Sequence, residues 1–202
     1  MVSALVKACA AAAAAALVGA PLARADVEQL PPREKTFPSA FGSFTVGVHD
    51  ENVNRLPPLN MVGTTREALV GHVAWGRVDG PAGGVLKTGY HVGCAVTVGP
   101  GQFGATPDLE AGIEGGEVPS PHILANPNPI VTLNLSPGEV SEVPVAEKEL
   151  IPGKVVQTVV RDFHIIVNAC SGPVAIRQFT YLYAKSAEVD DSGAVFGDST
   201  WL

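Results

Sequence analysis

The sequence predicts a mainly β fold, and three observations lead to this prediction. Several segments alternate apolar and polar residues with the two-residue period of a half-buried strand. The chain contains 22 glycines and 17 prolines, and many of them lie between these segments, where turns are expected. After residue 25 no segment of useful length carries a helical apolar period. We therefore expect an antiparallel β domain.

The first 25 residues have the features of a cleaved secretory signal peptide. Lys7 supplies a positive charge, and an apolar run from Ala8 to Ala20 follows it. Ala23-Arg24-Ala25 has the small-residue pattern of a cleavage site, so the mature chain is expected to begin at Asp26. An uncleaved membrane anchor is the alternative, but this alanine-rich run is shorter than the roughly 20 residues that span a bilayer.

Cleavage changes both the charge and the cysteine content. It removes Lys7, Arg24 and no acid, so the formal net charge falls from −7 to −9. An acidic chain without a basic patch is a poor nucleic-acid binder. Cys94 and Cys170 remain in a compartment that permits oxidation, which favours a disulfide between them. Two buried free thiols are the alternative.

The mature chain is expected to form one domain over residues 44–202, preceded by a loose arm. Residues 26–43 are polar and proline-rich, which indicates an N-terminal arm. In FTVGVHD (44–50), Phe44, Val46 and Val48 share one face of a strand. The further strand-like segments are ALVGHVAWGRV (68–78), VLKTGYHVGCAVTVG (85–99), IVTLNL (130–135), SEVPVAEKEL (141–150), VVQTVVRDFHIIVNAC (155–170), QFTYLYAKSAEV (178–189) and VFGDSTWL (195–202).

Residues 99–137 interrupt this pattern. The segment is rich in glycine and proline, and a structureless stretch of this length within a compact domain is usually functional or disordered. It contains four acids and no base in PDLEAGIEGGE, namely Asp108, Glu110, Glu114 and Glu117. A solvated acidic loop is one interpretation. The other is that symmetric copies of the loop surround an opening and attract cations.

No catalytic or metal-binding constellation is present in the sequence. The nucleophile elbow, the zinc-protease helix motif and the glycine-rich phosphate loop are all missing. The five histidines lie singly, without metal-ligand spacing. We therefore expect no enzyme, no metal site and no cofactor. The mature part also has no apolar run near 18 residues, so closure into a β-barrel is the physical route by which it could enter a membrane.

Several motifs resemble the MspA-type porins of mycolic-acid bacteria. GGVLKTGYHVGCAVTVG (83–99) is similar to a core strand of that family, as are EVPVAEKEL (142–150) and the stretch from FHIIVNAC to Pro173. The closing SAEVDDSGAVFGDSTWL (186–202) resembles the C-terminal signature of the family. These matches cover most of residues 56–202.

The resemblance implies a homo-octameric channel in the outer membrane of the cell envelope. Each subunit would have a β-sandwich-like rim domain, and its inserted segment would contribute two strands to a shared 16-stranded barrel. Residues 99–137 correspond to that insertion, and Glu114 and Glu117 lie nearest to the acidic constriction of the family, followed by Asp108 and Glu110.

The expected function is therefore a water-filled, cation-preferring channel for small hydrophilic solutes, with outer-membrane lipids and further copies of the chain as its partners. Cys94 and Cys170 would join the two strands that bracket the insertion. The alternative is a secreted or surface-attached β-sandwich that binds a ligand through residues 99–137 as a long recognition loop. A hydrolase has no motif to support it.

Overall fold

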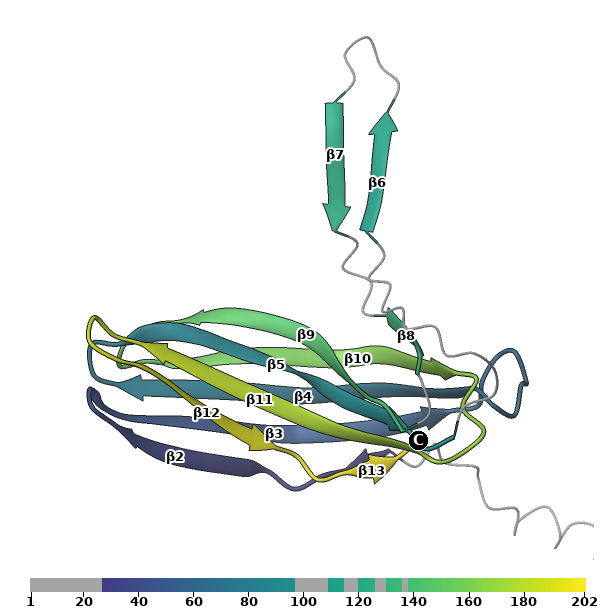
Figure 1. Cartoon of the computed structure of the whole chain (residues 1–202), viewed down its shortest axis with the longest axis horizontal. Coiled ribbons are helices and arrows are strands. Elements are labelled where there is room, and N and C mark those ends of the chain that lie inside the picture. Colours follow the sequence, from purple (N-terminus) through teal and green to yellow (C-terminus); the bar gives the residue numbers. More distant parts are fainter. Residues whose placement is uncertain (1–26, 97–108, 115–119, 126–129, 136–137) are drawn as a thin grey trace, which may run out of the picture.

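The computed structural model describes residues 27–96, 109–114, 120–125, 130–135 and 138–202. Within these ranges every regular element is a β-strand. Two sheets pack face to face as a sandwich, and a separate two-stranded hairpin projects from it (Figure 1). The prediction of a mainly β, sandwich-like domain is confirmed.

The larger sheet, sheet A, has six strands in the order β1-β3-β4-β10-β8, with β2 also paired to β3. All its pairs are antiparallel except β8 with β10. Its strands are β1 (Glu28–Gln29), β2 (Arg33–Ser39), β3 (Gly42–Leu56), β4 (Arg66–Asp79), β8 (Ile130–Asn134) and β10 (Val155–Asn168).

The smaller sheet, sheet B, has five antiparallel strands in the order β12-β11-β5-β9, with β13 also paired to β11. Its strands are β5 (Gly83–Cys94), β9 (Val140–Leu150), β11 (Val174–Lys185), β12 (Asp190–Phe196) and β13 (Thr200–Trp201). The long pairing of β11 with β5 runs from Val174↔Cys94 to Lys185↔Gly83 and forms the centre of this sheet.

The core lies between the sheets in two clusters, one toward each end of the sandwich. As the alternation predicts, Phe44, Val46 and Val48 of β3 all point inward and are buried. One cluster packs them against Leu86 and Leu182 of sheet B, among others. Removing each such side chain from water stabilises the fold by about 1.5–3 kcal/mol.

Two strand boundaries differ from the sequence-based expectation. The loose arm predicted for residues 26–43 is wrong, because β1 and β2 pair with β3. The chain turns at Gly42 with φ 128°, and Phe37 of β2 stacks on Phe44 at 5.2 Å, so the polar composition hides an edge strand. The strand predicted to continue to Gly99 ends at Cys94, and residues 97–99 lie outside the described ranges.

Candidate functional site

The insertion crosses between the two sheets. The chain leaves sheet B at Cys94, the last residue of β5, and next forms the hairpin of β6 (Leu109–Glu114) and β7 (Ser120–Ala125). It returns as β8 on the edge of sheet A, beside residues 164–168 of β10, and then enters β9 of sheet B. In Figure 1 the hairpin points away from the sandwich, on the side where β8, β9 and β10 lie.

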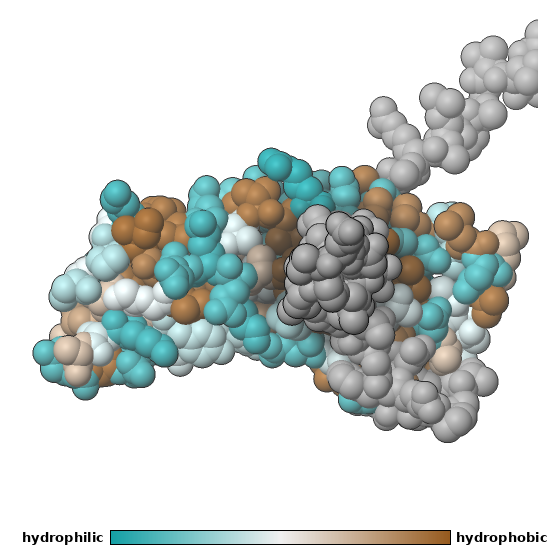
Figure 2. All heavy atoms as spheres, turned by 90° about the horizontal axis from the view of Figure 1, so that it is seen from above, coloured by the Kyte–Doolittle hydropathy of each residue, from teal (hydrophilic) through white to brown (hydrophobic). Residues whose placement is uncertain are grey.

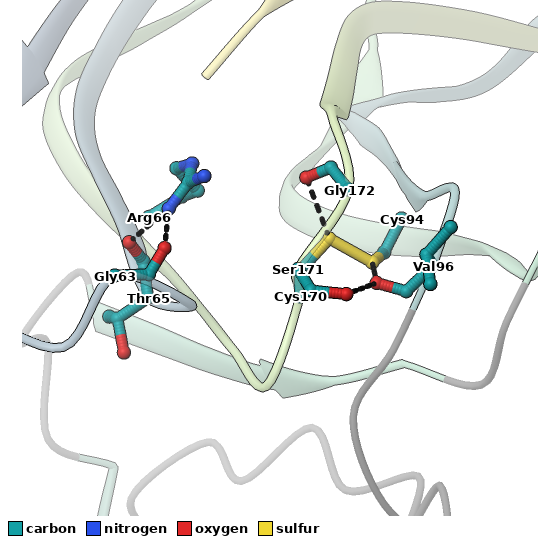
Figure 3. Close-up of a disulfide and its surroundings, with 8 residues drawn as sticks. All are labelled: Gly63, Thr65, Arg66, Cys94, Val96, Cys170, Ser171 and Gly172. Atoms are coloured by element: carbon teal, nitrogen blue, oxygen red, sulfur yellow. Dashed lines mark hydrogen bonds between the residues drawn. A yellow bond between two sulfur atoms is a disulfide. The ribbon is translucent and has the colours of Figure 1, made fainter.

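Backbone hydrogen bonds hold the base of the insertion together. The amide of Gly138, just before β9, donates to the carbonyl of Cys94 at 3.1 Å, so the two ends of the insertion are adjacent. The carbonyl of Val96 accepts from the amides of Ser171 (2.9 Å) and Gly172 (3.2 Å) and from the hydroxyl of Ser171 (3.3 Å). We call these residues, with Cys170, the insertion base (Figure 3).

The predicted disulfide between Cys94 and Cys170 is present, with the two Cα atoms 6.0 Å apart. Both half-cystines are buried. Cys170 follows β10 of sheet A, whereas the strand that comes directly after the insertion is β9 of sheet B. The bond therefore joins the two sheets, and it does not connect two strands that bracket the insertion as the sequence had suggested.

The β3–β4 loop lies next to the disulfide. The amide of Cys170 donates to the carbonyl of Thr64 at 2.9 Å. The Arg66 guanidinium donates to the carbonyls of Gly63 (2.7 Å) and Thr65 (2.9 Å), which fixes the end of the loop (Figure 3). The insertion base is thus attached to the rest of the domain by a covalent bond and by this hydrogen-bonded loop.

Apolar side chains are exposed on the side of the sandwich from which the hairpin projects. Figure 2 looks onto that side and shows brown patches separated by hydrophilic residues. The strands nearest to it, β8, β9 and β10, carry exposed aliphatic side chains, which are Ile130, Val140, Val155 and Val159. These side chains do not form one patch, because Val155 lines a groove on the outward face of sheet A, whereas Val140 lies beside His91 on sheet B.

The structure places two of the four predicted acids and leaves two outside the described residues. Glu110 and Glu114 lie on β6, opposite Leu124 and Ser120 of β7 in the backbone register. Asp108 and Glu117 fall in the ranges that are not described. The pairing of β6 with β7 agrees with the two strands that the family resemblance implied for the insertion, although the alternation there is weak. The Gly115-Gly116 pair between two short apolar segments is a further hairpin signal in the sequence.

A buried polar network, which sequence reasoning missed, crosses the core. His72 of β4 lies between the Tyr90 hydroxyl and the Thr88 hydroxyl, each 2.7 Å from a ring nitrogen. Burial lowers the pKa of His72 to about 4, so the ring is neutral near pH 7. Gln178 donates to Thr88 at 3.0 Å and to Thr180 at 2.6 Å. Such a network favours one arrangement of the core, although the buried Gln178 Oε1 has no hydrogen-bond partner among the described residues.

Glu51 lies near this network and is 2 % exposed. It sits at a bulge of β3, and no described residue bonds its buried Oε2. Burial, with Asp198 and Glu28 nearby, raises the pKa of Glu51 to about 8. A β-carbon at Gly197 would lie 2.2 Å from Oε2, so the closing segment packs directly on this carboxyl.

Within the described ranges, no three histidine, cysteine, aspartate or glutamate side chains gather as a metal ion would require. A search of the same residues finds no helix with the length and apolar character to cross a membrane.

A known protein family matches most of this chain. The model of the MspA family matches residues 42–200, which include the strands from β3 to β12 and the whole insertion. The chain belongs to the MspA family. This is a family of porins, so the predicted resemblance is confirmed and the site of interest is the insertion. None of the curated proteins matches the chain.

Proposed function

We propose that this MspA-family chain forms a water-filled channel as a homo-oligomer in the outer membrane of the cell envelope. The observation that supports the proposal is the β6–β7 hairpin, which projects from a folded sandwich as a membrane-entering element would (Figure 1). The hairpins of all subunits together would form one barrel, and the sandwiches would form its rim.

The physics of strands in lipid requires many copies. A hairpin alone leaves two rows of unpaired backbone groups, which lipid cannot satisfy, whereas a closed ring of hairpins has no edge. Two strands from each of eight subunits give 16, a number that encloses an aqueous channel. Each described strand pairs six residues, and a spanning strand needs about 9–11. The proposal therefore requires that pairing extend into the flanking residues in the assembled ring.

The test of channel formation is single-channel recording in planar bilayers. We expect stepwise conductance from the mature protein extracted in detergent, together with a large oligomer that resists SDS. The control replaces residues 101–127 with a short Gly/Ser linker, which leaves β8 and the insertion base in the chain. This variant should keep the sandwich and its disulfide and lose conductance. A water-soluble monomer without conductance would instead support the secreted binding domain.

The acids of the insertion are proposed to give the channel its cation preference. In a ring, Glu114 and Glu117, followed by Asp108 and Glu110, would be repeated in every subunit, and like charges round one opening raise the local cation concentration. We expect the reversal potential in a salt gradient to fall toward zero when all four are changed to Asn or Gln. Raising the salt should weaken the wild-type preference, because the Debye length is about 10 Å at 0.1 M.

A matched control removes charge elsewhere. Glu188→Gln with Asp190→Asn changes two exposed acids at the β11–β12 turn and should leave the reversal potential unchanged. If the quadruple variant keeps the cation preference and the conductance of the wild type, the four acids form only a solvated loop.

A further inference from the structure

The outward face of sheet B carries an aromatic ridge, which we define as Phe179, Tyr181, Tyr183 and Phe196. Phe179 stacks on Tyr181 with ring centroids 4.6 Å apart, and Phe196 lies 6.0 Å from Tyr181. Phe179 is already buried and stacks on His91 at 4.8 Å, so the free part of the ridge is Tyr183, which is 41 % exposed, and Phe196, which is 37 % exposed. The solvent face of an antiparallel sheet is ordinarily polar, so a row of rings here indicates a face that something covers.

The angles between these rings favour a protein as the covering partner. Tyr181 makes interplanar angles of 64° with Tyr183 and 84° with Phe196. Rings at such angles do not form the flat platform on which a sugar stacks. Arg177 lies over the Phe196 ring at 4.6 Å. Tyrosine, phenylalanine and arginine together are typical of the buried centre of protein interfaces.

The outward face of sheet A, on the opposite side of the sandwich, contains a groove of about 610 Å³. Its lining residues are Pro32, Arg33, Glu34, Val48, His49, Trp75, Val155 and Gln157. Trp75 lies across Gly47, where a β-carbon would come within 2.5 Å of the indole ring. Gly47 therefore allows the Trp75 indole to lie close to the backbone of β3, and the groove above the indole stays open.

The aromatic ridge and the sheet-A groove lie back to back, on opposite outer faces of the sandwich and at the same position along its strands. In the core, a β-carbon at Gly76 would be 2.7 Å from Leu182. Trp75 and Tyr183 are the strand neighbours of these two residues, and neighbours along a strand point to the opposite face. Trp75 and Tyr183 therefore point outward from opposite sides at one level. A second copy displaced through the thickness of the sandwich would bring its ridge onto this groove.

The charges around the two features are also complementary. Arg177 and Lys185 flank the ridge, and neither forms an ion pair with any acid in the described ranges. Glu34 lines the groove and pairs with no base among the same residues. Glu142 also lies near Tyr181, but it is paired with Lys87. Arg33 also lines the groove, but it is paired with Asp198. The unpaired Arg177 at the ridge and the unpaired Glu34 in the groove therefore have opposite signs, which disfavours contact between two ridges.

We propose that the aromatic ridge of one subunit packs into the sheet-A groove of the next. Because the two contacting surfaces differ, the interface is heterologous, and its repetition closes a ring when the rotation between neighbouring subunits divides a full turn. The inference rests on the proposed oligomeric channel and specifies which surfaces of the chain meet in it.

The interface is tested by cross-linking the detergent-extracted oligomer of the full chain and measuring the sizes of the linked products. Cysteines are introduced at Tyr183 in the ridge and at Gln157 in the groove, with Cys9→Ser throughout so that no other free thiol remains. With a short thiol-to-thiol cross-linker, a chain that carries both Tyr183→Cys and Gln157→Cys should give a ladder from dimers to the full ring. A mixture of the two single variants should give dimers and nothing larger.

Two further controls separate the proposal from other arrangements. Either single variant alone should give no linked dimer, and linkage within one of them would mean that like faces meet and overturn the proposal. Gln157→Cys with Glu188→Cys, which lies at the end of the sandwich, should give no ladder. Tyr183→Asp should shift the protein toward monomer by at least tenfold without losing the disulfide. An unchanged oligomer in that variant would contradict the proposal.

The outcomes for the interface and for the channel are distinguishable. If the double-cysteine protein conducts ions and resists SDS but gives no ladder, the interface is wrong and the channel stands. If the ladder forms and planar bilayers record no conductance, the interface stands and the channel function is wrong.

Discussion

Replacing both Cys94 and Cys170 with alanine is expected to lower the free energy of unfolding by about 4 kcal/mol. The bond closes a loop with a sequence separation of 76, and opening it restores that conformational freedom to the unfolded chain. It also joins the end of β5 in sheet B to the segment after β10 in sheet A. The loss should therefore be accompanied by loosening of the insertion base.

Urea unfolding of the mature protein at one fixed concentration measures this change. Wild type under reducing conditions should match the double alanine variant. The amides of Ser171 and Gly172, which donate to Val96, should exchange faster in the variant. A loss of stability below about 1 kcal/mol would show that the loop is already constrained in the unfolded chain.

Changing Glu51 to glutamine is expected to remove most of the pH dependence of stability between about pH 5 and 9. The carboxyl is buried and no described residue bonds its Oε2. The acids facing it are Glu28 from β1 and Asp198 from the β12–β13 connection, which pair with Arg55 and Arg33. From the interior, Tyr90 of β5 faces it, and its pKa is also raised.

The sign of the effect follows from where the proton is held. The pKa of Glu51 rises from 4.5 to about 8 in the folded protein, so in this range the native state holds a proton that the unfolded chain has released. The contribution of Glu51 to the free energy of unfolding should thus be largest below pH 4.5 and fall as the pH rises toward 8. The total loss is at most about 5 kcal/mol, because one pKa unit corresponds to about 1.4 kcal/mol.

Thermal and urea unfolding between pH 5 and 9 measure this dependence. Glutamine keeps the shape of the protonated carboxyl and cannot ionise, so the variant should be more stable than wild type at pH 9 and similar at pH 5. Glu188→Gln, at an exposed position, is the matched control and should keep the wild-type slope. A Glu51→Gln profile parallel to that of wild type would mean that Glu51 is ionised in the folded protein.

The sequence by itself determined the class of fold and the family. Alternation in 44–50 and 68–78 marked the buried faces of β3 and β4, because a strand with one face in the core must repeat every two residues. The two cysteines of the mature chain indicated the disulfide, and the motifs from Gly83 onward indicated the porin family. These features are local, so they can be inferred before any strand pairing is known.

Only the tertiary structure decided which elements meet. β2 has a polar, proline-containing sequence, and its pairing to β3 could not be inferred from composition. The pattern of β11 was visible as FTYLY, but that pattern alone does not say which alternate set of side chains is left outside the sandwich. Glu51 had no signal at all, since its burial depends on Gly197, which is far along the chain.

The physical reason is that apolar alternation along a strand predicts which of its residues can be buried. The strand register and the packing of the two sheets determine which other residues cover them. A strand pattern carries no information about its partner strand, and long-range pairing is fixed only when the whole core is assembled. For this chain, alternation therefore predicted a β domain with an insertion. The family resemblance implied the two strands of the insertion. The bond between the sheets and the back-to-back ridge and groove emerged only from the folded sandwich.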